Sequence, residues 1–329
     1  MAKKEVKRIF QYEKMTQTAL KKLNPANTMV IATFSPLEVH GPHLPFGQDY
    51  FEGYAMAEAT AEKMAKKNPA WSFLLLPPMP VATDTLPQIG SIEFPAPMVR
   101  DVAYHLLANF AKHGFARLAI SSFHGGPRHF LSLETAADMI TQEFGTPAMS
   151  LFSAVLSQIT EGDVFYDAIK DNPECKMTKE MLKKDHHAGF VETCMALNLW
   201  PELIEPDWDS LPPSTPDRTQ EGEMNDSYLY GYDGKPTIRQ KVERTWGVVD
   251  AIARTLKHFR QNTYYGYPAL ATKSQGVDLL GHLTDLATEI SQEFLDKGSD
   301  MELHSPLWRF HKIMLNRTLN KAANQFLGI

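Results

Sequence analysis

A short segment near the start of the chain, Leu37–Asp49 (LEVHGPHLPFGQD), combines carboxylates, imidazoles and turn-forming residues. Glu38 and His40 are two residues apart, so in an extended segment their side chains share one face. The glycines and prolines that follow turn the chain sharply and allow Asp49 to come back toward Glu38 and His40. Imidazole with carboxylates suits Zn, Mn or Fe, and a carboxylate can bridge two ions.

Two later segments carry the same residue types. His124-Gly125-Gly126 follows the apolar run Arg117–Phe123, where the glycines allow a close turn. His187 stands at the expected start of a helix, with Glu192 about one and a half turns into it. Each residue alone is more often a loop histidine or a solvated acid. The three segments together favour a metal cluster with a histidine acid/base.

The elements that must position these residues alternate between strand and helix patterns. Short apolar, β-branched runs predict strands at Thr28–Phe34, Phe73–Leu76, Arg117–Phe123 and Ala148–Phe152. Helical spacing with stop signals predicts helices at Tyr50–Lys67, Val99–His113, His129–Phe144 and Gly189–Trp200. This order predicts an α/β fold with a central, largely parallel or mixed sheet flanked by helices. Ligands bind beyond the carboxyl ends of such strands, where Glu38, His40 and His124 stand.

The sequence changes character after Pro201. The stretch Pro206–Gly234 is rich in Pro, Asp, Ser and Gly and is interpreted as an irregular excursion. Helical patterns follow over Arg239–Asn262, Gly276–Lys297 and Leu307–Phe326. The last of these is apolar enough to pack against its own domain or against another subunit.

The composition and net charge of the chain exclude several classes of protein. The chain has 329 residues, enough for one large domain or two, and 43% of them are hydrophobic, which excludes a disordered protein. With 33 Lys and Arg against 39 Asp and Glu, the net charge of −6 excludes nucleic-acid binding driven by bulk charge. Two cysteines make no disulfide framework, so a cytoplasmic location is expected. No secretory signal and no membrane-spanning apolar stretch is recognised.

The three chemical segments resemble, in order, the signatures of the creatininase (creatinine amidohydrolase) family. These look like Glu-x-His-Gly-x-His-Leu-Pro followed by Asp, then His-Gly-Gly after a strand, then His-Ala-Gly-x-x-Glu-Thr. Here they stand as Glu38–Pro45 with Asp49, His124–Gly126 and His187–Thr193. Gly90-Ser91-Ile92 also looks like a substrate-side element of the family, and Gly266–Thr272 followed by Gly276 like a late one. The resemblance covers roughly Thr28–Trp200 plus that late patch.

The resemblance implies a two-metal site for divalent Zn, Mn or Fe. Glu38 and His40 would each bind one ion, Asp49 would bridge the two, and His124 would join the ion of Glu38. Some family members have a further carboxylate two residues after the second-motif histidine, where this chain has Gly126. Glu192 is then the best candidate for the missing ligand, with a part in acid/base catalysis left open.

The remaining expected site residues face the substrate. The resemblance gives His187 the role of proton donor or acceptor, against the alternative that it only orients a ligand. Ser91 and Gly125 are expected to contact the substrate, although Ser91 is equally explained as a turn residue. His43 is expected to brace the loop.

The implied activity is that of a metal-dependent amidohydrolase acting on carbon-nitrogen bonds other than peptide bonds. A metal-activated water would cleave a small cyclic amide or a related amide. Creatininase proper surrounds its flat ring with tryptophans, but this chain has none between Trp71 and Trp200, so creatinine itself is not expected. The alternatives are a non-catalytic or peptide-processing family member acting in an assembly, and a metal enzyme of another class such as a lyase.

The resemblance also implies a domain organisation. Motif-like sequence lies on both sides of the excursion, which favours a single α/β domain over residues 1–329. Its core would span about 25–275, with the excursion at about 206–234 and a C-terminal helical extension at about 276–329. Family members commonly assemble, so a homo-oligomer is expected, with Leu307–Phe326 as the candidate interface.

Overall fold

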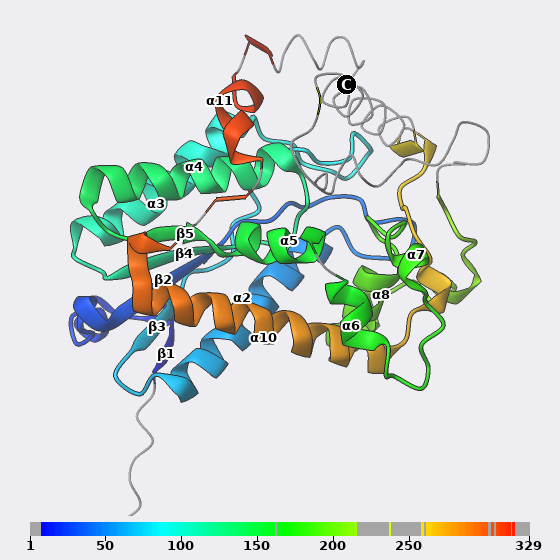
Figure 1. Cartoon of the computed structure of the whole chain (residues 1–329), viewed down its shortest axis with the longest axis horizontal. Coiled ribbons are helices and arrows are strands. Elements are labelled where there is room, and N and C mark those ends of the chain that lie inside the picture. The colour runs from blue at the N-terminus through cyan, green and yellow to red at the C-terminus, as the bar shows by residue number, and fades with distance from the viewer. Residues whose placement is uncertain are drawn as a thin grey trace, which may run out of the picture.

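A five-stranded parallel sheet forms the centre of the computed structural model (Figure 1). The structure describes residues 8–161, 163–215, 237, 258–259, 261–301, 304–305, 307–316 and 318–319. The sheet order is β1-β3-β2-β4-β5, and all four pairings are parallel. The strands are β1 (Ile9–Gln11), β2 (Thr28–Thr33), β3 (Ser72–Leu75), β4 (Arg117–Ser121) and β5 (Ala148–Ser150). The predicted parallel α/β fold is confirmed.

Helices cover both faces of this sheet (Figure 1). The longer ones are α2 (Gln48–Lys67), α3 (Ala96–Lys112), α4 (Pro127–Phe144), α5 (Leu151–Glu161), α8 (Phe190–Leu199) and α10 (Lys273–Lys297). The short ones are α1 (Gln17–Leu20), α6 (Val164–Ile169), α7 (Lys179–Leu182) and α11 (His311–Met314). Single 3₁₀ turns lie at Tyr12–Lys14, Pro25–Asn27, Pro201–Leu203, Trp208–Ser210, Pro268–Leu270, Gly298–Asp300 and Trp308–Phe310.

The central strand β2 shows how the two layers are held. Met29 and Ile31 belong to the core cluster under α2, α5 and α10, whereas Val30 and Ala32 belong to the cluster under α3 and α4. Every residue of β2 is buried. A strand covered on both faces favours apolar residues, and Met29–Ala32 form a continuous hydrophobic run between Thr28 and Thr33.

Helix α10 is part of the main core. Leu283, Ala287 and Phe294 lie in the same buried cluster as β2 and α2. At its first turn, a Cβ at Gly276 would stand 1.9 Å from the carbonyl oxygen of Cys194. The backbones of α8 and α10 therefore approach so closely that only glycine fits at this position. Helix α8, which carries Glu192, is fixed by this packing.

Several elements differ from the sequence prediction, and the short helices α1, α6 and α7 were not predicted. The strand predicted through Phe152 ends at Ser150, and α5 begins at Leu151, because periodicity cannot separate a short buried strand from the start of a buried helix. Strand β1 was not predicted, since its three residues are only half-buried.

The single helix predicted over Leu307–Phe326 is wrong in its described part. A 3₁₀ turn and the short α11 end at Met314, and Asn316 Oδ1 then accepts hydrogen bonds from the backbone N–H of Thr318 and Leu319. This asparagine competes with the helix for backbone donors and so interrupts it.

Some sequence predictions lie outside the described residues. They are residues 216–234 of the excursion, residues 239–257 and 260 of one predicted helix, and residues 320–326 of the last one. Within the described part of the chain, no helix is long and apolar enough to cross a bilayer.

Candidate metal centre

Four elements bring the predicted site residues together at the carboxyl edge of the sheet. Glu38 and His40 lie in the loop after β2, Asp49 in the first turn of α2, and His124 directly after β4. The start of α8 adds His187 and Glu192. Glu38, His40, Asp49 and His124 are each less than 9% exposed. Because parallel strands end at one edge, loops far apart in sequence deliver their side chains to one place.

Their ligand atoms form two groups that share Asp49. Glu38, Asp49 and His124 make one group, and His40, Asp49 and Glu192 make the other, with ligand atoms within 4.8 Å of one another in each. Asp49 Oδ1 is 3.0 Å from His40 Nε2, and Asp49 Oδ2 is 3.1 Å from His124 Nδ1. One carboxylate thus turns an oxygen toward each group. Glu38, His40 and His187 form a third group.

Backbone carbonyls orient both imidazoles. His40 Nδ1 donates to the carbonyl of Glu38 at 2.9 Å, which leaves Nε2 toward Asp49 and, at 3.6 Å, toward Glu192 Oε2. His124 Nε2 donates to the carbonyl of Thr83 at 3.0 Å, which leaves Nδ1 toward Asp49 and, at 3.3 Å, toward Glu38 Oε2. Such hydrogen bonds fix which nitrogen offers its lone pair when the ring is neutral.

The cluster is a network of buried opposite charges. Burial opposes the charging of His40, but the carboxylates of Asp49 and Glu192 raise the pKa of His40 to about 10. For His124, burial is likewise outweighed by Glu38 and Asp49, and the pKa lies well above its usual value. Burial opposes the ionisation of Asp49, yet the two imidazoles hold the pKa of Asp49 below its usual range. In the metal-free protein, the protonated imidazoles of His40 and His124 therefore balance the negative charge of these carboxylates.

The chemistry of this donor set fits divalent cations. Glu38 Oε1 accepts a hydrogen bond from the backbone N–H of Leu86, whereas the buried Oε2 has only the ion-pair contact with His124 Nδ1 at 3.3 Å and no well-formed hydrogen bond among the described residues. Buried acceptors without a donor are rare in folded proteins. An orphan carboxylate oxygen among imidazoles and other carboxylates is satisfied by Zn, Mn or Fe.

His187 differs from the other two cluster histidines in its partners. Its Nε2 donates to the carbonyl of Val39 at 2.8 Å, so Nδ1 carries the lone pair of the neutral ring. Its ring centroid lies 4.3 Å from that of His40. Burial, and after it the charge of His40, lowers the pKa of His187 to about 4. His187 is therefore a neutral imidazole that can accept a proton at Nδ1.

Glu192 sits at the first turn of α8, where the helix start is held by another carboxylate. Glu192 Oε2 accepts from the backbone N–H of Ala188 at 2.6 Å, and burial raises the pKa of Glu192 to about 8. Asp185 accepts from the N–H groups of Phe190 at 2.6 Å, Val191 at 2.9 Å and Tyr267 at 3.1 Å. Asp185 thus caps α8 and ties it to the late segment.

The residues expected on the substrate side have simple surroundings. Ser91 Oγ accepts from the backbone N–H of Val39 at 3.1 Å, so Ser91 supports the residue whose carbonyl holds His187. Gly125 is exposed, with open space where a Cβ would be. His43 Nε2 donates to Thr193 Oγ1 at 2.9 Å and so links the first loop to α8.

Sequence reasoning missed several residues at the site. Glu52 is completely buried and lies one turn after Asp49 on the same helix; the i, i+3 spacing was a signal for it. Phe259, 5.5 Å from the His187 ring, and Tyr265, whose backbone pairs with that of His187, come from beyond the excursion. No sequence pattern places this late segment over the site.

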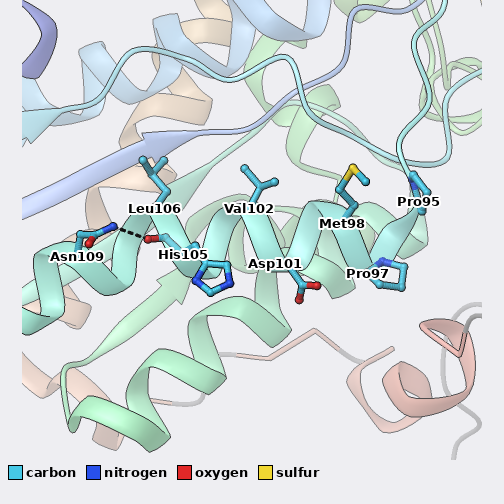
Figure 2. A pocket seen from close by; sticks show the side chains of 8 residues that line it. All are labelled: Pro95, Pro97, Met98, Asp101, Val102, His105, Leu106 and Asn109. Atoms are coloured by element: carbon cyan, nitrogen blue, oxygen red, sulfur yellow. Dashed lines mark hydrogen bonds between the residues drawn. The ribbon is translucent and has the colours of Figure 1, made fainter.

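A separate hollow of about 660 Å³ lies along the exposed face of α3 (Figure 2). Its lining residues are Pro95, Pro97, Met98, Asp101, Val102, His105, Leu106 and Asn109. None of the cluster residues lines it. The hollow is therefore separate from the cluster at the sheet edge.

Comparison with known proteins is consistent with this geometry. The family model described as creatinine amidohydrolase matches residues 13–290. The chain belongs to the creatininase family. No curated protein sequence matches it significantly. The matched residues 13–290 include all the elements that carry the cluster residues, and also Tyr265, whose backbone pairs with that of His187.

Solved creatininase structures share the fold at low sequence identity. A creatinine amidohydrolase (creatininase) aligns with a TM-score of 0.58 and 16% identity, covering 86% of this chain and 97% of the other. A creatininase described with Mn gives 0.56 and 15%, covering 86% and 98%. A mutant creatininase of Zn–Zn type gives 0.57 and 14%, with the same coverage. At these identities the likeness establishes the fold.

Proposed function

We propose that this member of the creatininase family is a metal-dependent amidohydrolase with two divalent cations. One cation would be held by Glu38, Asp49 and His124, and the other by His40, Asp49 and Glu192. The observation that carries the proposal is Asp49, whose two oxygens face one imidazole each, at 3.0 and 3.1 Å. Of the proposed ions Zn, Mn and Fe, the first two are supported by the names of the related Mn and Zn–Zn creatininase structures.

When bound, divalent cations lower the pKa of a water to near ~7 and polarise an amide carbonyl. The residues of the chain do the rest. His187 Nδ1 accepts the proton of the attacking water and then donates it to the departing amide nitrogen. The hydrogen bond from Nε2 to the carbonyl of Val39 holds the ring in the tautomer that this proton transfer requires. Phe259, 8% exposed, shields one side of the ring from solvent.

The proposed substrate is a small cyclic amide or a related amide with a non-peptide C–N bond. Gly125 would let a substrate approach the backbone beside His124, and Ser91 would line the opposite loop. The chain lacks tryptophan between Trp71 and Trp200. Stacking of a flat creatinine ring by that segment is therefore not available, and creatinine is excluded from the proposed substrates.

The decisive experiment is a substrate screen with metal-loaded protein. Purified protein would be reconstituted with Zn, Mn or Fe and offered cyclic amides, formamides, short peptides and creatinine. We expect hydrolysis of a cyclic or linear amide that disappears on chelation and returns with metal. Absence of stoichiometric metal, or hydrolysis confined to peptides, would contradict the proposal.

We also propose a single-domain, cytoplasmic homo-oligomer. The support is an exposed apolar surface near the C-terminus, where Phe310 is 42% and Ile313 is 61% exposed. Light scattering at working concentration tests this, and a monodisperse monomer would contradict it.

A further inference from the structure

One buried carboxylate beside the metal centre has no role in the mechanism above. Glu52 lies one turn after Asp49 in α2 and is 0% exposed. Its Oε1 accepts a hydrogen bond from Gln48 Nε2 at 2.9 Å. Its Oε2 is buried with no hydrogen-bond partner among the described residues. Glu52 is thus a second carboxylate, after Glu38, with a buried oxygen that makes no hydrogen bond among the described residues.

Gln48 ties Glu52 to Glu192. The same Gln48 Nε2 that donates to Glu52 also donates to the backbone carbonyl of Glu192 at 3.0 Å. Trp200 Nε1 donates to Gln48 Oε1 at 3.1 Å, which fixes the orientation of the amide. Glu52, Gln48 and the first turn of α8 therefore form one rigid, buried unit.

Among the residues that the structure describes, no positive side chain forms an ion pair or a hydrogen bond with Glu52. Burial, and after it the charges of Glu192 and Asp49, raise the pKa of Glu52 well above its usual value. This contrasts with Asp49, whose oxygens face imidazoles. A buried carboxyl surrounded by other carboxylates is costly unless a cation is close. The group therefore lacks the partner that would explain its burial.

The charges of the proposed metal centre indicate that this partner is one of the two cations. Glu38, Asp49 and Glu192 bring three negative charges against the four positive charges of two divalent ions, and Glu52 would make the fourth. The backbone at Gly126 leaves no room for a carboxylate on that side, because a Cβ there would lie 2.7 Å from His124 Nε2 and 2.6 Å from Asp84 Cβ. A further protein carboxylate at this centre therefore has to come from an element other than the His124–Gly126 turn.

We propose that Glu52 is the fourth carboxylate of the metal centre. It balances the charge of the cation at His40, Asp49 and Glu192, and through Gln48 it positions Glu192. This inference rests on the proposed two-metal function. It assigns Glu52 to the second cation and leaves the group of Glu38, Asp49 and His124 unaffected.

The test is metal binding by Glu52→Gln, which keeps the size of the side chain and removes its charge. Titration of the metal-free protein with Zn²⁺ or Mn²⁺ should show the second ion bound roughly 10- to 100-fold more weakly, as for other supporting residues of metal sites. The first ion should bind as in the wild type. Glu134→Gln is the matched control, since Glu134 is also a buried helical glutamate, 1% exposed, and lies outside the cluster.

Thermal unfolding separates this role from a merely structural one. Metal-free Glu52→Gln should be at least as stable as the wild type, because a repelled buried carboxyl is removed. Its metal-induced rise in Tm should be smaller than that of the wild type. Glu52→Asp, which keeps the charge, should retain more of the second ion than Glu52→Gln and serves as the second variant if the glutamine protein does not fold.

The outcomes distinguish this inference from the proposed function. If the wild type binds two ions and Glu52→Gln binds both with wild-type affinity, the inference is overturned and the function stands. Wild-type protein that binds no metal would overturn both.

Discussion

Two buried aspartates at the same edge of the sheet have opposite surroundings. Asp185 is 9% exposed and accepts hydrogen bonds from three backbone N–H groups. Asp49 is 2% exposed and faces two imidazoles. Backbone N–H groups cannot give up their protons, whereas imidazolium groups can exchange theirs for a cation. The partners of a buried carboxylate, and not its burial, therefore distinguish a structural site from a chemical one.

The largest expected effect comes from Asp49→Asn. Because Asp49 belongs to both ligand groups, we expect loss of both ions and a fall in activity beyond the ~100-fold caused by residues that only support a metal site. Metal content after gel filtration and the rate on the best amide of the screen measure this. Asp185→Asn is the matched control, and metal loss in that variant as well would break the comparison.

The substitution His187→Ala tests whether the partners of a buried imidazole also distinguish its role, as they do for the two aspartates. His40 faces carboxylates, whereas His187 Nε2 is held by a backbone carbonyl. Removing an acid/base group lowers kcat by ~10²–10⁴-fold. We expect this loss with unchanged metal stoichiometry, measured on the same preparation. Loss of an ion would instead make His187 a ligand, in line with its grouping with Glu38 and His40.

Asp185→Ala tests the structural half of the comparison. The substitution leaves three backbone donors without their acceptor, two at the start of α8 and one at Tyr267. At roughly 1–3 kcal/mol for a buried unsatisfied group, partly offset by water, we expect the free energy of unfolding to fall by about 3 kcal/mol. Denaturant titration of the metal-free protein measures it. An unchanged midpoint would contradict the capping role.

The smallest effect is on the pH dependence of the metal-free protein. The pKa of His40 is raised from about 6.5 to about 10, so its stabilising contribution is complete below pH ~6.5 and is lost as pH rises through about 10. We expect a loss of about 2 kcal/mol over that window, reduced from the full linkage value by the coupled carboxylates. Metal-loaded protein should lose less, because bound imidazoles are neutral. Parallel unfolding curves with and without chelator would refute this.

The sequence predicted the site better than the parts that enclose it. Glu38, His40, Asp49, His124, His187 and Glu192 lie together because their motifs are local and parallel strands end at one edge. The i, i+3 spacing places Glu52 on the same face of α2 as Asp49. It does not show that the Glu52 carboxyl is buried without a full set of hydrogen bonds, because burial depends on the whole fold.

Long-range packing also decided the other differences. Strand β1 forms only by pairing with β3, which lies more than sixty residues later. The interruption after α11 depends on one asparagine side chain, which hydrophobic periodicity does not detect. Neither feature has a local pattern strong enough to predict.

The pairing of His187 with Tyr265 has a consequence for how the enzyme is made. All six candidate ligand and acid/base residues leave the ribosome before Phe259 and Tyr265 do. A nascent chain, or a fragment cut within the excursion, carries every motif of the site and still lacks the segment that holds and shields His187. The order of synthesis therefore separates the appearance of the cluster residues from that of the segment that contacts His187.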